Sequence, residues 1–365
     1  MKLTIDRDVL ADAVAWTAHA LPHRPSAPVL AGLLLDASAD GLTISAFDYD
    51  TSRRTTTAAD VAEPGRVLLP GRVLAEVVKA LPKQQVTIAL SGTEVTISCG
   101  NAEFALLTMP VEDYPKLPEP PDAVGEVDAQ QLAAAVAQVA PAASRDETLP
   151  MLTGMRVDTD AGHLTLAATD RYRIAARDLT WQPTTPGAGV GVMIPGRLLH
   201  DITKSLPAGE ATIGVGDSLA SLQTSGRTTT VRLLDPQFID YRARLNIDYP
   251  IWAEVTAAEL TAAVKRVTLV AERGNNGVRL AFADGQVTVR AGGADTGRGT
   301  EVLDADLDGD AIEIAFQAPL LLDGLAGVDG RARIGMTTPA KPALILPAGA
   351  DDPDYRYLVM ALRLS

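Results

Sequence analysis

The same helical pattern occurs three times along this chain. Each copy has mainly apolar residues at positions i, i+3, i+4 and i+7, which form the buried stripe of an amphipathic helix. The three stripes are Leu10, Ala13, Val14 and Thr17; Leu132, Ala135, Val136 and Val139; and Leu260, Ala263, Val264 and Val267. An extended segment precedes each stripe, and Asp6, Asp128 and Thr256 stand where a helix N-cap is expected. The chain is therefore predicted to repeat one structural unit three times.

A second helical stripe follows the first in every copy. It lies in LLPGRVLAEVVKALP (68–82), MIPGRLLHDITKSLP (193–207) and AFQAPLLLDGLAGVDG (315–330). The third is the weakest, because Gly324 and Gly327 lower its helix propensity. Alternating β-branched runs separate the helices, and turn dipeptides at 40–41, 161–162 and 284–285 predict the same hairpin in each copy.

These elements predict an α+β protein of three tandem domains. The two helices of a copy are about 63 residues apart, so each domain is expected to be a doubled strand-helix-strands motif. Proline-containing segments separate the copies, which places the domains at residues 1–122, 123–251 and 252–365. A repeat of about 120–128 residues has the size of a whole domain.

Charge and cysteine content restrict the function. The formal net charge of −14 argues against a protein that coats DNA through a basic surface. Cys99 is the one cysteine, so no disulfide can form within the chain and a reducing cytoplasm is expected. The charged N-terminus MKLTIDRDVL is unlike a signal peptide, and no run of about 18 apolar residues occurs.

Candidate catalytic, metal and cofactor sites are sparse. The four histidines are scattered and form no ligand cluster. GAGVGV (187–192) leads into a strand-like segment, whereas a dinucleotide loop opens a helix. DADLDGD (304–310) resembles the start of a calcium loop but has Ala315 where the closing glutamate belongs. We therefore expect no enzyme activity, no cofactor and no metal.

Basic residues cluster modestly on or beside the repeated helices. A solvated helix face explains any one cluster, but together they could line a channel with positive charge. The candidate DNA-contacting residues are Arg24, Arg72, Lys79, Arg197, Lys204, Lys265 and Arg266.

Several local motifs resemble one known family. They are HRPSAPVL (23–30), LPGR (69–72), LPMLTGM (149–155), ATDRYRIA (168–175), FIDYRARL (238–245) and YLVMALRL (357–364). With the threefold repeat, they resemble the bacterial DNA polymerase III beta subunit, the beta sliding clamp, in its actinobacterial form. The likeness covers essentially the whole chain.

The resemblance implies a head-to-tail homodimer that forms a ring, with helices lining the hole and sheets facing outward. Duplex DNA would pass through the ring, with its phosphates near the basic residues, and a clamp loader would place the ring on DNA. Phe104 and Leu106 would lie on one side of the dimer interface and Leu269 and Val270 on the other. Such a clamp is a processivity factor rather than an enzyme.

The resemblance also implies an apolar cleft that receives short peptides from DNA polymerase III alpha, other polymerases and the clamp loader. Its lining, carried over by position, is Leu152, Thr169, Arg171, Tyr172, Arg173, Ile174, Ile239, Leu358, Met360, Leu362 and Arg363. Met and Leu suit a pocket that accepts several peptides, since they repack at low cost. Ordinary inter-domain core is the alternative interpretation of the same residues.

The predicted cleft departs from the family pattern. Ile239 stands where the family has proline, Ala243 replaces a basic residue, and Met360-Ala361-Leu362-Arg363 replaces Met-Pro-Met-Arg. Our hypothesis is a diverged clamp whose cleft still takes partner peptides but discriminates against another ligand, such as an inhibitor. A hydrolase with a site at a domain junction and a structural oligomer without DNA are the rival functions.

Overall fold

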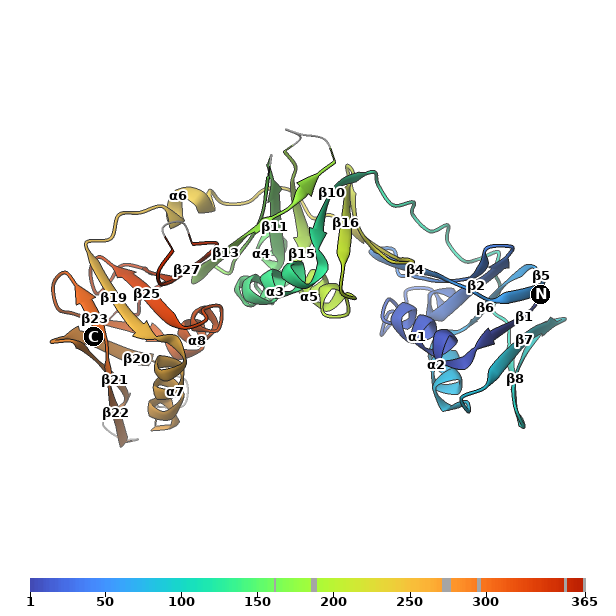
Figure 1. Cartoon of the computed structure of the whole chain (residues 1–365), viewed down its shortest axis with the longest axis horizontal. Helices are drawn as coiled ribbons and strands as arrows, with labels where there is room; N and C mark the ends of the chain where they lie inside the picture. The colour runs from blue at the N-terminus through green and yellow to red at the C-terminus, as the bar shows by residue number, and fades with distance from the viewer. Residues whose placement is uncertain (161, 185–188, 271–276, 294–296, 351–352, 364–365) are drawn as a thin grey trace. The chain divides into compact units, whose positions relative to one another are not determined.

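Two compact units make up the chain. The computed structural model describes residues 1–160, 162–184, 189–270, 277–293, 297–350 and 353–363. The first unit consists of Met1–Glu126 and Gly209–Arg232, and the second of Val127–Ala208 and Leu233–Ser365. Each unit combines helices with antiparallel strands (Figure 1), which confirms the α+β class.

The order of elements repeats three times. The first repeat contains β1 (Lys2–Asp6), α1 (Arg7–Ala18), β2 (Gly32–Ser38), β3 (Gly41–Phe47), β4 (Thr51–Thr57), β5 (Asp60–Glu63), β6 (Gly65–Pro70), α2 (Gly71–Ala80), β7 (Gln85–Ser91), β8 (Glu94–Cys99) and β9 (Ala102–Leu107). The second contains β10 (Ala123–Asp128), α3 (Ala129–Val139), α4 (Pro150–Thr153), β11 (Gly154–Thr159), β12 (His163–Thr169), β13 (Arg173–Thr180), β14 (Gln182–Pro183), β15 (Gly191–Pro195), α5 (Gly196–Thr203), β16 (Glu210–Val215), β17 (Leu219–Thr224) and β18 (Arg227–Arg232). After α6 (Tyr241–Leu245), the third contains β19 (Ile251–Thr256), α7 (Ala257–Val267), β20 (Gly277–Ala283), β21 (Gln286–Gly293), β22 (Gly297–Asp304), β23 (Asp306–Asp308), β24 (Ile312–Gln317), α8 (Ala318–Leu325), β25 (Arg331–Met336), β26 (Ala343–Pro347) and β27 (Tyr355–Val359).

Each repeat is thus a β-α-β-β-β motif built twice, as the sequence predicts. The two long helices of a repeat pack on each other, α1 on α2, α3 on α5 and α7 on α8 (Figure 1). Their apolar stripes are buried against the sheets, which gives each helix pair one covered face and one polar face.

The last strands of the half-motifs join neighbouring half-motifs. In the first unit β4 pairs antiparallel with β18, so the strands run in the order β16-β17-β18-β4-β3-β2-β6. In the second unit β13 pairs antiparallel with β27, which gives the nine-stranded order β15-β11-β12-β13-β27-β26-β25-β19-β23. Two smaller sheets have the orders β5-β1-β7-β8-β9 and β22-β21-β20-β24.

Two of the three predicted N-caps make capping hydrogen bonds. Asp6 Oδ1 accepts hydrogen bonds from the backbone N–H groups of Asp8 (2.8 Å) and Val9 (3.2 Å). Asp128 does the same at the start of α3. Thr256 holds the N-cap position of α7, but its side chain makes no capping hydrogen bond, so that part of the prediction is wrong. The start of α7 depends instead on the burial of its apolar stripe.

The hairpin turns follow from residues that tolerate positive φ. Asp284 (φ 52°) and Gly285 (φ 77°) both have the left-handed conformation of a type I′ turn, as the dipeptide predicts. Gly41 (φ 116°) begins β3 after the corresponding turn of the first repeat. In the second repeat, residue 161 of the predicted turn lies outside the described residues.

The two glycines that weaken the helical pattern of α8 make room for tyrosine rings. A Cβ atom added at Gly324 would lie 2.5 Å from Tyr357 Cδ1, and one at Gly327 would lie 2.3 Å from Tyr355 Cζ. Both tyrosines are fully buried on β27, and Tyr357 donates a hydrogen bond to the Leu320 carbonyl (2.8 Å). Close packing therefore outweighs helix propensity at Gly324, whereas Gly327 lies just beyond the end of α8.

Gly324→Ala is expected to destabilise the protein even though alanine favours helices. The added methyl group must displace the Tyr357 ring, which should lower the free energy of unfolding by about 1–3 kcal/mol. Urea unfolding followed by circular dichroism measures the change. Gly162→Ala is the matched control, because nothing lies within 4 Å of a Cβ added there. A stability gain for Gly324→Ala would contradict the packing argument.

Candidate functional site

A tight turn between β12 and β13 presents two predicted cleft residues to solvent. Asp170 Oδ1 accepts hydrogen bonds from the backbone N–H groups of Tyr172 (3.0 Å) and Arg173 (3.1 Å). Thr169 Oγ1 accepts one from the Arg171 N–H (3.2 Å) and donates one to the Arg173 carbonyl (2.7 Å). Arg171 has a positive φ of 78°. The turn leaves Arg171 exposed and Tyr172 53% exposed.

The segment after β27 meets this turn. The Met360 N–H donates a hydrogen bond to the Tyr172 carbonyl (2.9 Å), which continues the pairing of β13 with β27. Met360 is 43% exposed. The structure therefore brings an exposed aromatic residue and an exposed thioether from two distant segments side by side. Large exposed apolar residues that lie together are typical of a binding surface.

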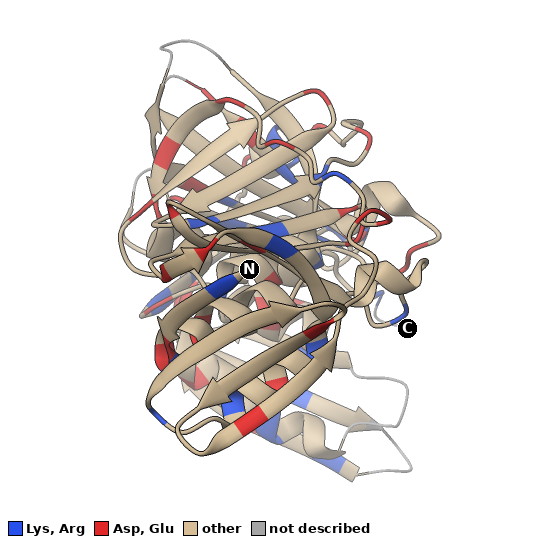
Figure 2. Cartoon of the chain, turned by 90° about the vertical axis from the view of Figure 1, so that its right-hand side faces the viewer, with Lys and Arg blue, Asp and Glu red and all other residues tan. Residues whose placement is uncertain are grey.

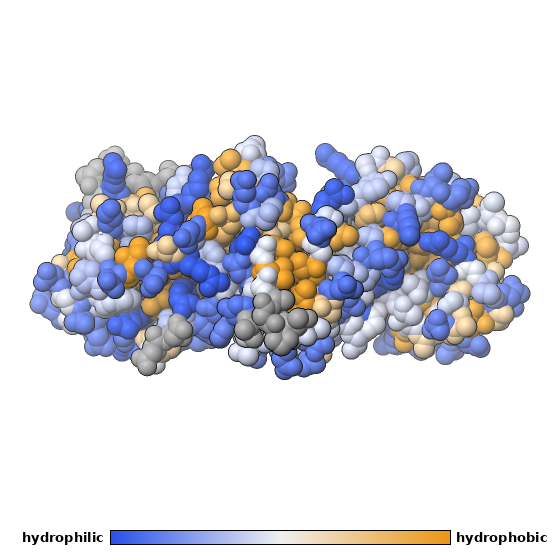
Figure 3. All heavy atoms as spheres, turned by 90° about the horizontal axis from the view of Figure 1, so that it is seen from above, coloured by the Kyte–Doolittle hydropathy of each residue, from blue (hydrophilic) through white to orange (hydrophobic). Residues whose placement is uncertain are grey.

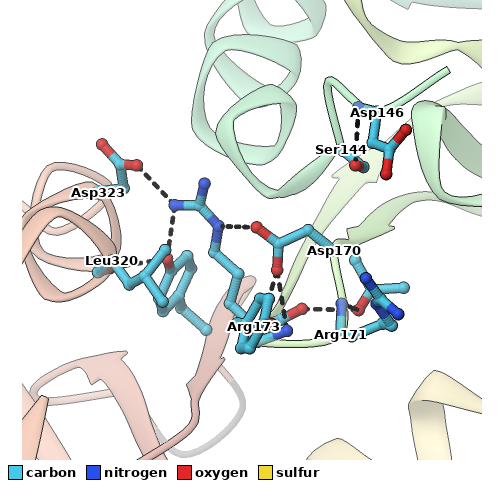
Figure 4. A network of polar contacts seen from close by, with 10 residues as sticks. Ser144, Asp146, Asp170, Arg171, Arg173, Leu320 and Asp323 are labelled. Atoms are coloured by element: carbon cyan, nitrogen blue, oxygen red, sulfur yellow. Dashed lines mark hydrogen bonds and ion pairs between the residues drawn. The ribbon is translucent and has the colours of Figure 1, made fainter. Parts of the chain in front are cut away.

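The Arg173 side chain fixes the turn through hydrogen bonds (Figure 4). Its Nε donates to Asp170 Oδ2 (2.9 Å), and its Nη1 donates to Asp323 Oδ2 (2.5 Å) on α8 and to the Tyr357 hydroxyl (3.1 Å). The side chain is only 11% exposed. Burial alone would lower the pKa of Arg173, but Tyr357 and the two aspartates outweigh burial and raise it. Arg173 is thus a positioning residue whose guanidinium is already occupied.

An apolar cluster joins three more of the predicted cleft residues. Ile174 and Leu358 are buried in it, and Ile239 is partly buried against it. Other members include Tyr241, whose hydroxyl donates to Asp158 Oδ2 (2.9 Å). Burial raises the pKa of Tyr241, and the negative charge of Asp158 raises it further, so the hydroxyl stays a donor. The segment containing Ile239 is therefore anchored beside β13 and β27.

The other predicted cleft residues are placed by separate contacts. Leu152 is buried on α4, and Thr169 is buried at the base of the turn. Leu362 is half-buried and donates its N–H to the Ala315 carbonyl (2.7 Å), and Arg363 after it is exposed. Thus hydrogen bonds link five predicted residues (Thr169, Arg171, Tyr172, Arg173 and Met360), and the apolar cluster joins three others.

Sequence reasoning missed the residues that hold the turn. Asp170 has a recognisable signal, because an aspartate in a short hairpin loop commonly bonds backbone N–H groups two and three residues later. Asp323 has no such signal, because it is 150 residues from Arg173 and on another repeat. Tyr357 begins the YLVMALRL motif, but its contact with Arg173 depends on the pairing of β13 with β27.

The predicted DNA-contacting residues are all exposed. Arg72 and Lys79 lie on α2, Arg197 on α5, Lys265 and Arg266 in the last turn of α7, and Lys204 caps α5. Arg24 lies in the segment before β2. Acidic groups offset part of this charge, since Lys204 pairs with Asp201 (3.2 Å) and Arg266 with Glu301. Figure 2 shows basic and acidic positions interspersed along the ribbon.

The predicted interface residues lie at the edges of the two smaller sheets. Phe104 is exposed and Leu106 half-buried on β9, the last strand of the five-stranded sheet. Leu269 is 84% exposed in the short helical turn after α7, with Val270 half-buried beside it. That turn packs against β22, the last strand of the four-stranded sheet. Figure 3 shows other apolar atoms reaching the surface among hydrophilic ones.

The described part of the chain contains no group of side chains suited to bind a metal ion. Among these residues, no three or more His, Cys, Asp or Glu side chains are grouped so that they could hold a metal ion. The DADLDGD segment forms the last residue of β22, all of β23 and the bend after it, which matches its strand-like alternation. Within the same residues, no helix combines the length and the apolar character needed to cross a membrane.

Comparisons with known proteins agree with this architecture. The N-terminal, central and C-terminal domains of the DNA polymerase III beta subunit match residues 1–118, 126–240 and 248–363. The beta sliding clamp of Streptomyces coelicolor is 44% identical over 100% of both chains, and the beta sliding clamp homolog GriR of Streptomyces muensis is 40% identical over 100% of this chain and 99% of its own. The crystal structure of the DNA polymerase sliding clamp from Bacillus subtilis matches with a TM-score of 0.94 at 27% identity, covering 100% of both chains. The motifs, the repeated fold and these matches together show that the chain belongs to the DNA polymerase III beta subunit family, the beta sliding clamps.

Proposed function

We propose that two copies of this chain close into a ring around duplex DNA and tether DNA polymerases to it. The chain acts in the cytoplasm as a processivity factor without a catalytic step of its own. Its three domains, at residues 1–122, 123–251 and 252–365, supply one half of the ring. A clamp loader opens the ring and places it on DNA, and no cofactor or metal belongs to the protein itself.

The unpaired edges of β9 and β22 are the observation that carries this proposal. In both strand junctions within the units, the last strand of a first half-motif pairs with the last strand of a second half-motif, β4 with β18 and β13 with β27. The remaining last strands are β22 and β9, and each has a partner strand on only one side in the described sheets. Exposed strand edges favour pairing with another chain.

Pairing of β9 with β22 of a second copy completes the pattern. It joins the five-stranded sheet of one copy to the four-stranded sheet of the other, which gives the nine strands seen in the sheet that contains β13 and β27. The contact is heterologous, since it joins two different surfaces, and two such contacts related by a twofold axis close a ring. Phe104, Leu106, Leu269 and Val270 then bury apolar surface beside the new strand pair.

A closed ring explains how an acidic protein stays on DNA. With a net charge of −14, general attraction to phosphate is weak. The exposed basic residues on or beside α2, α5 and α7, together with Arg24, supply local, sequence-independent contacts that permit sliding. Retention then depends on topology, and partner proteins reach the ring through peptides that bind across Tyr172 and Met360.

Topological retention is tested with the full-length protein, a clamp loader and ATP on nicked circular DNA. We expect the protein to remain with the circle during gel filtration and to be released when a restriction enzyme linearises the DNA. A ring that is not bound by charge should also resist a salt concentration that strips ordinary DNA-binding proteins. Retention that is unchanged on linear DNA and falls with salt would show simple charge binding instead. No retention on any DNA would favour a structural oligomer.

Leu269→Asp is expected to weaken the dimer. A carboxylate at this position would be buried without a partner when β22 meets β9, so the dimer dissociation constant should rise at least about tenfold. Sedimentation velocity over a range of protein concentrations measures the change. Val9→Asp, at an exposed apolar residue on α1, is the control and should leave the dimer intact. An unaltered dimer in Leu269→Asp would exclude this interface.

Tyr172→Ala and Met360→Ala are each expected to weaken binding of a polymerase-derived peptide. Removal of a large apolar contact from the centre of such a surface typically raises the dissociation constant about tenfold. Fluorescence anisotropy of the labelled peptide measures it. Tyr49→Ala is the control, because Tyr49 is a tyrosine of similar exposure in the equivalent turn after β3, one position before the counterpart of Tyr172. Equal affinities of wild type and the three variants would place the peptide elsewhere.

The effect of Ile239 on ligand choice stays a prediction.

A further inference from the structure

The turn that bears Arg171 is built twice in this chain. Between β3 and β4, Asp48 Oδ1 accepts hydrogen bonds from the N–H groups of Asp50 (3.0 Å) and Thr51 (2.6 Å). These bonds match the two that Asp170 accepts in the turn between β12 and β13. Tyr49, with a φ of 76°, has the place of Arg171, with a φ of 78°. The backbone of this turn therefore accepts different side chains at the position and does not require arginine.

A residue other than glycine at this position costs free energy. Positive φ brings Cβ close to the backbone, which glycine avoids. The aspartate and threonine hydrogen bonds hold the conformation but gain nothing from the arginine side chain. Strain of this kind, which glycine would relieve, points to a role for the side chain itself.

Arg171 has no ion-pair partner among the residues that the structure describes. Arg173, two residues later, pairs with Asp170 and Asp323, whereas in the described part of the chain no carboxylate lies within ion-pair distance of the Arg171 guanidinium. Hydrogen bonds from Thr148 lower the pKa of Asp146, and the charge of Arg171 adds to that effect from a greater distance. Figure 4 shows Arg171 and Asp146 with no interaction drawn between them. Within the described residues, Arg171 is thus an exposed cation without an ion pair, on a protein of strongly negative net charge.

Arg171 also stands directly beside the exposed apolar pair. It precedes Tyr172 in the chain, and Tyr172 is bonded through its carbonyl to the Met360 N–H. Arg363, three residues after Met360, is a second exposed cation on the same segment. An apolar surface with cations next to it fits a peptide that combines apolar anchors with acidic neighbours, because opposite charges select partners and like charges reject them.

We propose that Arg171 determines partner specificity by pairing with a carboxylate of the bound peptide. The preferred occupant is a short segment with apolar anchor residues flanked by aspartate or glutamate. This inference rests on the proposed function, since it assigns a chemical preference to the surface formed by Tyr172 and Met360. The negative net charge of the chain disfavours acidic peptides at surfaces that lack exposed cations.

Matched peptides test the proposal. The probes are a labelled polymerase-derived peptide with glutamine at every position flanking its apolar anchors, and a series in which one glutamine at a time is glutamate. Wild type should bind at least one glutamate peptide about three- to tenfold more tightly than the glutamine peptide at low salt, and less selectively at high salt. Arg171→Gln and Arg171→Gly should bind the glutamine peptide as wild type does but lose this preference.

A charge-reversal variant and a control variant separate a specific ion pair from a structural effect. Arg171→Glu should prefer a peptide with lysine at the position where wild type prefers glutamate, which a purely structural role of Arg171 cannot produce. Arg279→Gln removes a charge from β20 in the same unit and should keep the glutamate preference. The proposal is overturned if Arg171→Gln retains the preference or if wild type has none while binding the glutamine peptide. Failure of every protein to bind any peptide would instead contradict the proposed function.

Discussion

Hydrogen bonding along strand edges is the constraint on which this architecture depends. Each half-motif ends in a strand whose outer N–H and C=O groups need partners, and β4 with β18 and β13 with β27 satisfy one another within the chain. The chain ends with one first-half strand, β22, and one second-half strand, β9, left over. A row of domains joined in this way leaves one edge of each kind, and a second copy is the simplest way to satisfy both.

The same junctions create the candidate peptide site. Pairing of β13 with β27 brings Met360 to Tyr172 and places Tyr357 and Asp323 within reach of Arg173. Arg173 then ties the turn of one repeat to α8 of the next, and Asp170 fixes the backbone that exposes Arg171 and Tyr172. A buried ion pair of this kind is valuable for position more than for stability, because desolvation offsets much of its attraction.

The charged residues of this molecule have two separate roles. Most arginines near the strand junctions are committed to aspartates, such as Arg227 to Asp12 and Arg177 to Asp354, so they organise the fold without making the surface basic. The basic residues on or beside the helices are exposed, and acidic neighbours partly neutralise them. This distribution suits a protein that holds DNA by enclosure, because strong phosphate binding would impede sliding.

Periodicity in the sequence by itself determined the threefold repeat, the doubled motif, the six long helices and the hairpin at Asp284-Gly285, because burial of one helix face and turn geometry are local demands. The resemblance of short motifs to the clamp family pointed to Tyr172 and Met360. Only the tertiary structure decided that Thr256 makes no capping hydrogen bond, that Gly324 accommodates the Tyr357 ring, and that Arg173 is engaged by Asp323. Those outcomes depend on which distant segments the strand pairing brings together. The residue spacing within one segment contains no information on the shape or charge of a neighbour from another part of the chain.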